Sequence, residues 1–177
     1  MTDVGSVEAA CEVAHGGAAP EVTGRVLAVV FASPVAEHLL RYGEDLGFRT
    51  LLVEPDADRR KQVTGVKVTG TMPGDLDGGC DVVVTDHHRG ELGPMLRDAL
   101  ALPVRWIGVM GNPRHPGPHR EALAALGVPD AEIARVHRPI GLNIGSRTPA
   151  EIGIATIGGL LADRNGRPGG FQFDYPQ

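Results

Sequence analysis

The fold of this chain is decided near its N-terminus by residues 25–54, which read RVLAVVFASPVAEHLLRYGEDLGFRTLLVE. Residues 26–31 form a continuous apolar run, as expected for a strand that is buried on both faces. Pro34 then stands where the first turn of a helix tolerates proline, and Ser33 precedes it as the expected N-cap. A second apolar run follows at residues 50–53. Strand, helix and strand in this order predict a βαβ unit with a right-handed crossover.

The same alternation continues through the rest of the chain. Further strands are predicted at 65–69, 81–85 and 104–109, and helices at 91–100, 119–126 and 148–163. The last helix begins with Thr148-Pro149-Ala150-Glu151, which is a capping box with proline in the first turn. Glycines at 153, 158 and 159 are expected to let this helix approach the sheet closely. The predicted fold class is α/β, a single Rossmann-like domain with a doubly wound, mostly parallel sheet of four or five strands and helices on both faces.

The two ends of the chain differ from this pattern. Residues 1–23 are expected to be a flexible leader or remnant linker, residues 24–166 the domain, and residues 167–177 a Pro/Gly-rich tail. The formal net charge of −5 gives no general electrostatic reason to bind nucleic acid, and no apolar run reaches the length of a membrane span. No signal peptide is recognisable, and the two cysteines form no C-x-x-C pair. A cytoplasmic location is therefore expected.

Candidate site residues are those that follow each predicted strand, because ligands of doubly wound sheets bind beyond the carboxyl ends of the strands. A dinucleotide site needs glycines after the first strand, whereas this chain offers Ala32, Ser33 and Pro34. The turn is either a modified phosphate loop or a plain N-capped helix start. Glu54 stands where a carboxylate would hold a ribose hydroxyl, and the alternative is a solvated loop acid.

Thr85 ends the strand at 81–85, and Asp86, His87 and His88 follow it. Adjacent histidines on an extended chain point to opposite sides, which makes them poor common ligands of a metal. The residues are therefore interpreted as cleft lining or as a surface loop. No set of metal ligands and no catalytic residue is predicted.

Two later loops could contact an anion. Gly111 permits close approach and Arg114 supplies positive charge near a helix start. Gly141 and Asn143 precede the last helix, where they are interpreted either as a second anion contact or as part of a tight, glycine-dependent turn.

Taken together, these segments resemble the C-terminal Rossmann domain of the XdhC/CoxI proteins, which are accessory factors for xanthine dehydrogenase and related molybdenum hydroxylases. The resemblance covers about residues 25–166 and rests on residues 47–50, on residues 106–111, and above all on HRPIGLNIGSRTPAEI at 137–152. It implies binding of the molybdenum cofactor (molybdopterin or its cytosine dinucleotide), protection of the cofactor during sulfuration, and delivery to the target enzyme. The implied cofactor-binding residues are Ser33, Glu54, Thr85, Asp86, Gly111, Arg114, Gly141 and Asn143.

The chain also departs from the family pattern. The glycine-rich turn is replaced by residues 31–34, the Gly-Ser-basic loop by residues 111–114, and the N-terminal domain with the family's cysteine is expected to be missing. NAD(P) is therefore not expected as a cofactor. The hypotheses, in order of preference, are a molybdenum-cofactor accessory protein, a ligand-free interaction module, and an NAD(P)-dependent oxidoreductase. The expected partner is a molybdenum hydroxylase or a full-length XdhC-type paralogue, with a homodimer as an alternative and without nucleic acid or membrane.

Overall fold

The computed structural model describes residues 11–19, 23–111 and 117–170. Within these residues, parallel strands form one six-stranded sheet with the order β3-β2-β1-β4-β5-β6. The strands are β1 Val26–Val30, β2 Arg49–Val53, β3 Val68–Thr69, β4 Cys80–Val84, β5 Trp106–Val109 and β6 Val136–His137. This is the strand order of a doubly wound dinucleotide-binding sheet, and the order reverses between β1 and β4.

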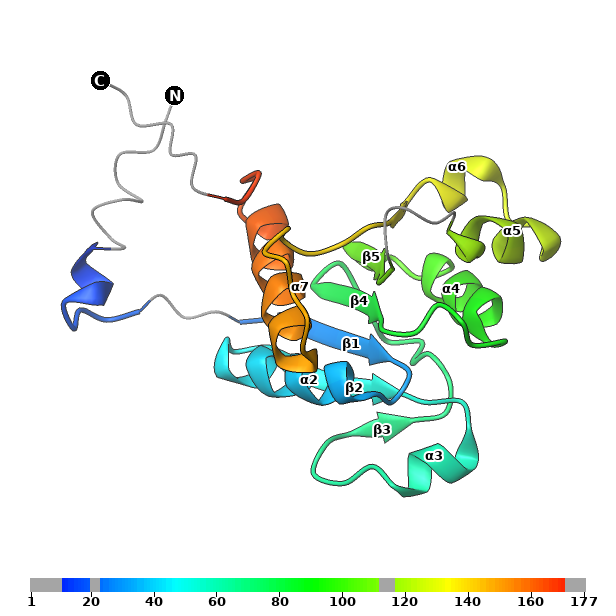
Figure 1. The fold of residues 1–177 in the computed structure, drawn as a ribbon, viewed down its shortest axis with the longest axis horizontal. Coiled ribbons are helices and arrows are strands. Elements are labelled where there is room, and N and C mark those ends of the chain that lie inside the picture. Colours follow the sequence, from blue (N-terminus) through cyan, green and yellow to red (C-terminus); the bar gives the residue numbers. More distant parts are fainter. Residues whose placement is uncertain (1–10, 20–22, 112–116, 171–177) are drawn as a thin grey trace.

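Helices cover both faces of the sheet (Figure 1). They are α2 Pro34–Asp45, α3 Ala57–Lys61, α4 Leu92–Leu100, α5 Pro118–Ala125, α6 Asp130–Ile133 and α7 Pro149–Arg164. Alternate residues of β1 enter two separate cores. Leu27 and Val29 pack with α2 and α7, whereas Ala28 and Val30 pack with α4 and α5. The predicted α/β class and Rossmann-like sheet are confirmed.

The sheet has six strands, one more than the upper end of the predicted four or five. The strand that sequence analysis missed is β6, which has two residues and pairs with β5 through Ile107↔Val136 and Gly108↔His137. A two-residue strand has no periodicity to detect, so its existence depends on the neighbouring strand.

The predicted caps of the two longest helices are both present. The Ser33 hydroxyl accepts a hydrogen bond from the Ala36 N–H at the start of α2, at 3.1 Å. At the start of α7, Thr148 and Glu151 form the reciprocal capping box. These caps satisfy backbone N–H groups that have no partner within the helix.

The expectation for the glycines of α7 was wrong, because they do not face the sheet. A Cβ atom at Gly153 would meet His38 and Tyr42 of α2, and one at Gly159 would meet the backbone of Gly141. Gly158 faces the Leu142 side chain. The small residues therefore let α7 approach α2 and the loop that precedes α7.

Cys11 is exposed and Cys80 is buried, and both are free thiols. Burial raises the pKa of the Cys80 thiol to about 12, so this cysteine is not available as a thiolate. No helix in the described part of the chain combines the length and apolar character needed to cross a membrane.

Candidate functional site

The turn after β1 begins with a strained residue. Phe31 has a φ of 73°, in the left-handed region where glycine is favoured. Its ring is fully buried, and the Arg89 guanidinium lies 4.7 Å from the ring centroid. An aromatic side chain therefore holds the position at which a glycine-rich phosphate turn would begin.

Two substitutions of Phe31 separate backbone strain from burial of the ring. Phe31→Ala and Phe31→Gly both remove the ring, at a cost of about 3–5 kcal/mol. Glycine also relieves the left-handed strain of about 1–2 kcal/mol. We therefore expect Phe31→Gly to be the more stable variant, the reverse of the usual order for these two residues. Urea unfolding with matched m values tests this, and a Phe31→Ala protein that equals or exceeds Phe31→Gly in stability contradicts it.

Glu54 closes the same turn from inside the protein. Its side chain is fully buried, and its carboxylate accepts hydrogen bonds from the backbone N–H groups of Ala32 at 2.8 Å and Asp56 at 3.0 Å. Arg89 Nη2 donates to Glu54 Oε1 at 3.0 Å. The interpretation of Glu54 as a solvated loop acid is therefore wrong. The Glu54 carboxylate therefore already accepts a hydrogen bond from the first free N–H group of the turn, that of Ala32.

Ser33 and Thr85 meet at the point where the strand order reverses. The Ser33 hydroxyl donates to Thr85 Oγ1 at 3.1 Å, and Thr85 Oγ1 lies 2.9 Å from the carbonyl oxygen of Phe31. The structure thus brings these two predicted site residues together, but as a link between β1 and β4. Pro34 has no N–H, and the Ala36 N–H is bound to Ser33, which leaves few donors at the start of α2 for a pyrophosphate.

The histidine pair after β4 differs from its prediction. Asp86 Oδ1 accepts a hydrogen bond from the His88 N–H at 2.9 Å, which turns the chain, and the rings of His87 and His88 lie 4.0 Å apart. The expectation that they point to opposite sides was wrong because the segment is not extended. Among the residues that the structure describes, no group of three or more His, Cys, Asp or Glu could hold a metal ion.

The burial of His119 and the partial burial of His87 predict that the free energy of unfolding depends on pH. Burial lowers the pKa of His119 at the start of α5 and that of His87, and the charge of Arg138 lowers both further. The unfolded chain takes up protons at these histidines near pH 6.5, before the folded chain does. We expect the free energy of unfolding to be maintained above pH 6.5 and to fall as the pH drops below it. Urea unfolding at pH 7.5 and 5.5 measures the change in the free energy of unfolding between the two pH values. The His119→Gln variant should show a smaller change. An equal difference in the variant contradicts the assignment to His119.

The other predicted site residues lie away from this turn. A Cβ atom at Gly111 would collide with the Arg138 guanidinium, so this glycine makes room for an arginine of the protein itself. Gly141 has a φ of 90° and lies against the backbone of α7, as expected for a tight, glycine-dependent turn. Asn143 is exposed. Arg114 lies outside the described residues.

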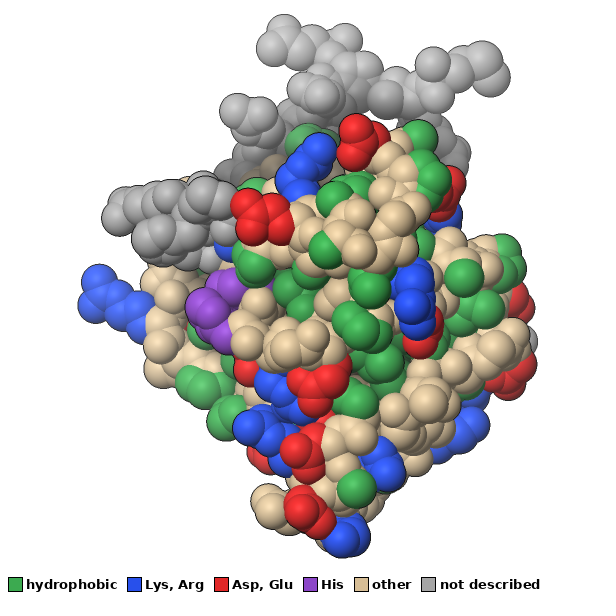
Figure 2. All heavy atoms as spheres, turned by 90° about the vertical axis from the view of Figure 1, so that its right-hand side faces the viewer, with side chains coloured by type: hydrophobic (Ala, Val, Ile, Leu, Met, Phe, Trp, Pro, Cys, Tyr) green, Lys and Arg blue, Asp and Glu red, His purple; other side chains and the backbone are tan. Residues whose placement is uncertain are grey.

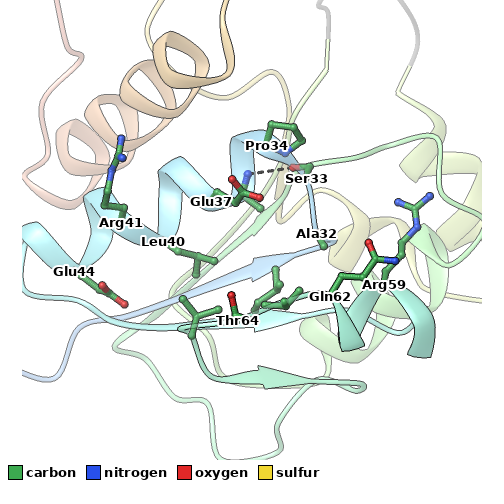
Figure 3. Close-up of a pocket in the computed structure, with 14 residues that line it drawn as sticks. Ala32, Ser33, Pro34, Glu37, Leu40, Arg41, Glu44, Arg59, Gln62 and Thr64 are labelled. Carbon is green, nitrogen blue, oxygen red and sulfur yellow. Dashed lines mark hydrogen bonds between the residues drawn. The ribbon is translucent and has the colours of Figure 1, made fainter.

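A cavity of about 820 Å³ opens beside this turn, between α2 and the segment that follows β2 (Figure 3). Its apolar lining is supplied by Ala36, Leu40, Leu52, Val63 and Val66. Its polar lining is supplied by Ser33, Glu37, Arg41, Glu44, Arg59, Gln62 and Thr64. Of the eight predicted cofactor-binding residues, Ser33 lies in this lining, while Arg59 and Gln62 were missed. The signal that could have found them is their place shortly after the second strand, beside Glu54.

Comparison with known proteins identifies the fold family. The family model described as the XdhC Rossmann domain matches residues 27–160. The chain belongs to this family. This chain is also 38% identical over 68 residues to the uncharacterized protein YqeB of Escherichia coli K12. The match covers 38% of this chain and 13% of YqeB.

A solved structure with the same fold is the crystal structure of a xanthine dehydrogenase from Bacillus halodurans. It has a TM-score of 0.61 and 21% identity to this XdhC Rossmann domain, and the match covers 81% of this chain and 43% of that chain. This likeness shows the fold. The chain thus spans less than half the length of either protein.

Figure 2 looks onto the carboxyl ends of the strands of the XdhC Rossmann domain. Histidine side chains gather in one place on this face, while acidic and basic side chains are interspersed. Because the face carries no broad field of one sign, binding of an anion here depends on individual side chains.

Proposed function

We propose that this XdhC Rossmann domain is a non-catalytic accessory protein that binds the molybdenum cofactor and assists the maturation of a molybdenum hydroxylase. The observation that carries the proposal is the cavity of about 820 Å³ that begins at the turn after β1 and runs along α2, in a member of this family. The end of the cavity at Ala32–Pro34 lies at the carboxyl end of β1, where ligands of doubly wound sheets usually bind.

The lining of the cavity fits part of this cofactor. Molybdopterin and its cytosine dinucleotide present flat, polar-edged rings, which suit a floor of Leu40, Leu52 and Val63. Arg59 in the same lining could meet a phosphate group. The turn at Ala32–Pro34 fits a pyrophosphate poorly, because the Ala32 N–H already donates to Glu54. This disfavours NAD(P), and it places any ligand phosphate of the pterin at Arg59 instead of at the turn. We therefore propose that NAD(P) is not the ligand.

The proposed partner is a molybdenum hydroxylase such as xanthine or carbon monoxide dehydrogenase, or a full-length XdhC-type paralogue, in the cytoplasm. Support comes from the family to which the chain belongs. A homodimer is the alternative assembly, and native mass spectrometry separates the two.

Thermal unfolding of the chain with molybdopterin, its cytosine dinucleotide, NAD and NADP tests ligand binding. A ligand at about a hundred times its dissociation constant stabilises the folded state by roughly 2.7 kcal/mol. We expect this stabilisation for molybdopterin, whose single phosphate does not need the N–H groups of the turn after β1. Co-expression with a molybdenum hydroxylase tests the role, and unchanged hydroxylase activity with and without the chain contradicts it.

One observation favours a second function, a ligand-free interaction module. The Ala32 N–H is satisfied by Glu54 instead of being available to a ligand. This hypothesis expects no stabilisation by any pterin or nucleotide, together with capture of a full-length XdhC-type paralogue by the purified chain.

A further inference from the structure

The cavity between α2 and the segment after β2 combines an apolar floor with polar groups from two facing elements (Figure 3). Leu40 and Glu37 come from α2, three residues apart and therefore on one side of the helix. Arg59 and Gln62 come from α3 and its C-cap. The volume of about 820 Å³ lies within the range of about 300–1,000 Å³ for small-molecule sites. An apolar slot with polar edges fits a flat heterocycle.

Arg59 is the cation of this lining that remains open to a ligand. Its guanidinium makes no hydrogen bond or ion pair with the described residues. The pKa of Asp56 is lowered mainly by the hydrogen bond from the Arg59 backbone N–H and, to a smaller extent, by the Arg59 charge. The other arginine of the lining, Arg41, is engaged. Its Nη2 lies 3.0 Å from His38 Nδ1, and its guanidinium lies over the Tyr42 ring. In Figure 3, the side chains of Arg59 and Gln62 extend toward the turn at Ala32.

This arrangement offers a phosphate group the Arg59 side chain instead of the turn after β1. In a dinucleotide site, the pyrophosphate binds the N–H groups of the turn after β1. Here Glu54 fills that place by accepting the Ala32 N–H, and Pro34 offers none. A ligand phosphate at Arg59 would be held by a side chain at the edge of the cavity, without the turn.

Glu37 supplies a hydrogen-bond acceptor, whereas Arg59 supplies donors. Its carboxylate has no hydrogen-bond partner among the described residues and stands beside the apolar floor. A carboxylate accepts hydrogen bonds and donates none when ionised, so it matches an amino group on the edge of a ring.

We propose that this cavity binds a nucleoside monophosphate whose base carries an exocyclic amino group. The base lies on Leu40 and its neighbours, its amino group faces Glu37, and its phosphate meets Arg59 and the Gln62 amide. The inference rests on the proposed function only in that both place the ligand in the same crevice.

Isothermal titration of the whole chain with CMP, AMP, GMP, UMP, their nucleosides and NAD tests this proposal. We expect the amino-bearing monophosphates to bind at least tenfold more tightly than their nucleosides and than NAD. Arg59→Ala should remove this tenfold gain and leave nucleoside binding unchanged. Arg97→Ala, which removes an exposed arginine of α4 on the other face of the sheet, is the matched control and should have no effect. Glu37→Gln should reduce the preference for CMP over UMP.

Three results would overturn the proposal: no binding by any monophosphate, NAD binding as tight as that of the monophosphates, or an Arg59→Ala protein that binds CMP, AMP and GMP as the parent does. The measurement needs no partner enzyme. Monophosphate binding without an effect on hydroxylase maturation therefore contradicts the proposed function alone, and maturation without monophosphate binding contradicts this inference alone.

Discussion

Replacing Glu54 by glutamine is expected to lower the free energy of unfolding by about 3–5 kcal/mol, as when one partner of a buried ion pair is removed. The Glu54 carboxylate is fully buried and binds two backbone N–H groups and the Arg89 guanidinium. Every one of these partners is a donor. The amide of glutamine keeps one acceptor oxygen and turns a second donor toward them, so at least one buried donor loses its acceptor.

Glu91→Gln is the matched control for this prediction. Glu91 pairs with the same Arg89 guanidinium at 3.1 Å, but its side chain is 41% exposed, against 0% for Glu54. An exposed ion pair contributes about 0–1 kcal/mol. Urea unfolding of both variants measures the difference. Similar losses in the two proteins would show that burial of Glu54 does not stabilise the turn.

Asp81→Ala is expected to cost a similar amount, about 3–5 kcal/mol, at the opposite end of the sheet. Asp81 is fully buried at the start of β4, and its two oxygens bind separate arginines, Arg105 at 2.6 Å and Arg164 at the end of α7. Arg164 also donates to the carbonyl oxygen of Gly79 at 2.7 Å. Removing the carboxylate leaves two partly buried cations without their common anion and loosens the attachment of α7 to the sheet.

Asp163→Ala serves as its control, because Asp163 pairs with Arg105 but is 42% exposed. We expect a loss below about 1 kcal/mol from this variant. Chemical denaturation monitored by Trp106 fluorescence reports both, since Trp106 lies in the strand next to β4. An Asp81→Ala protein as stable as Asp163→Ala would contradict the assignment of a stabilising role to the Asp81 cluster.

The strand and helix pattern was predictable because it depends on local sequence. The apolar run at 26–31, the N-cap at Ser33 and the capping box at 148–151 all appear as predicted, apart from shifts of a residue or two at the ends of elements. Apolar periodicity and caps act within one turn or one strand, so they can be recognised without knowledge of neighbours.

The candidate site was predictable only as a region. Sequence analysis placed it at the strand ends, and Ser33, Glu54 and Thr85 do lie around the switch point. Their roles depended on partners distant in sequence, because Glu54 meets Ala32 across 22 residues and Arg89 across 35. No local pattern indicates whether a carboxylate at a strand end faces a ligand or an internal arginine.

By itself, the sequence determined a doubly wound α/β domain, its principal helix caps, and the edge of the sheet at which a ligand is expected, because each follows from local spacing and from the geometry of parallel strands. Tertiary structure alone decided that Glu54 turns inward to close the phosphate turn, and that α7 packs its glycines on α2 and Gly141. It also decided that Arg59 borders a cavity. The physical reason is that burial and ion pairing depend on contacts between segments far apart in the chain. These contacts exist only once the whole sheet has assembled.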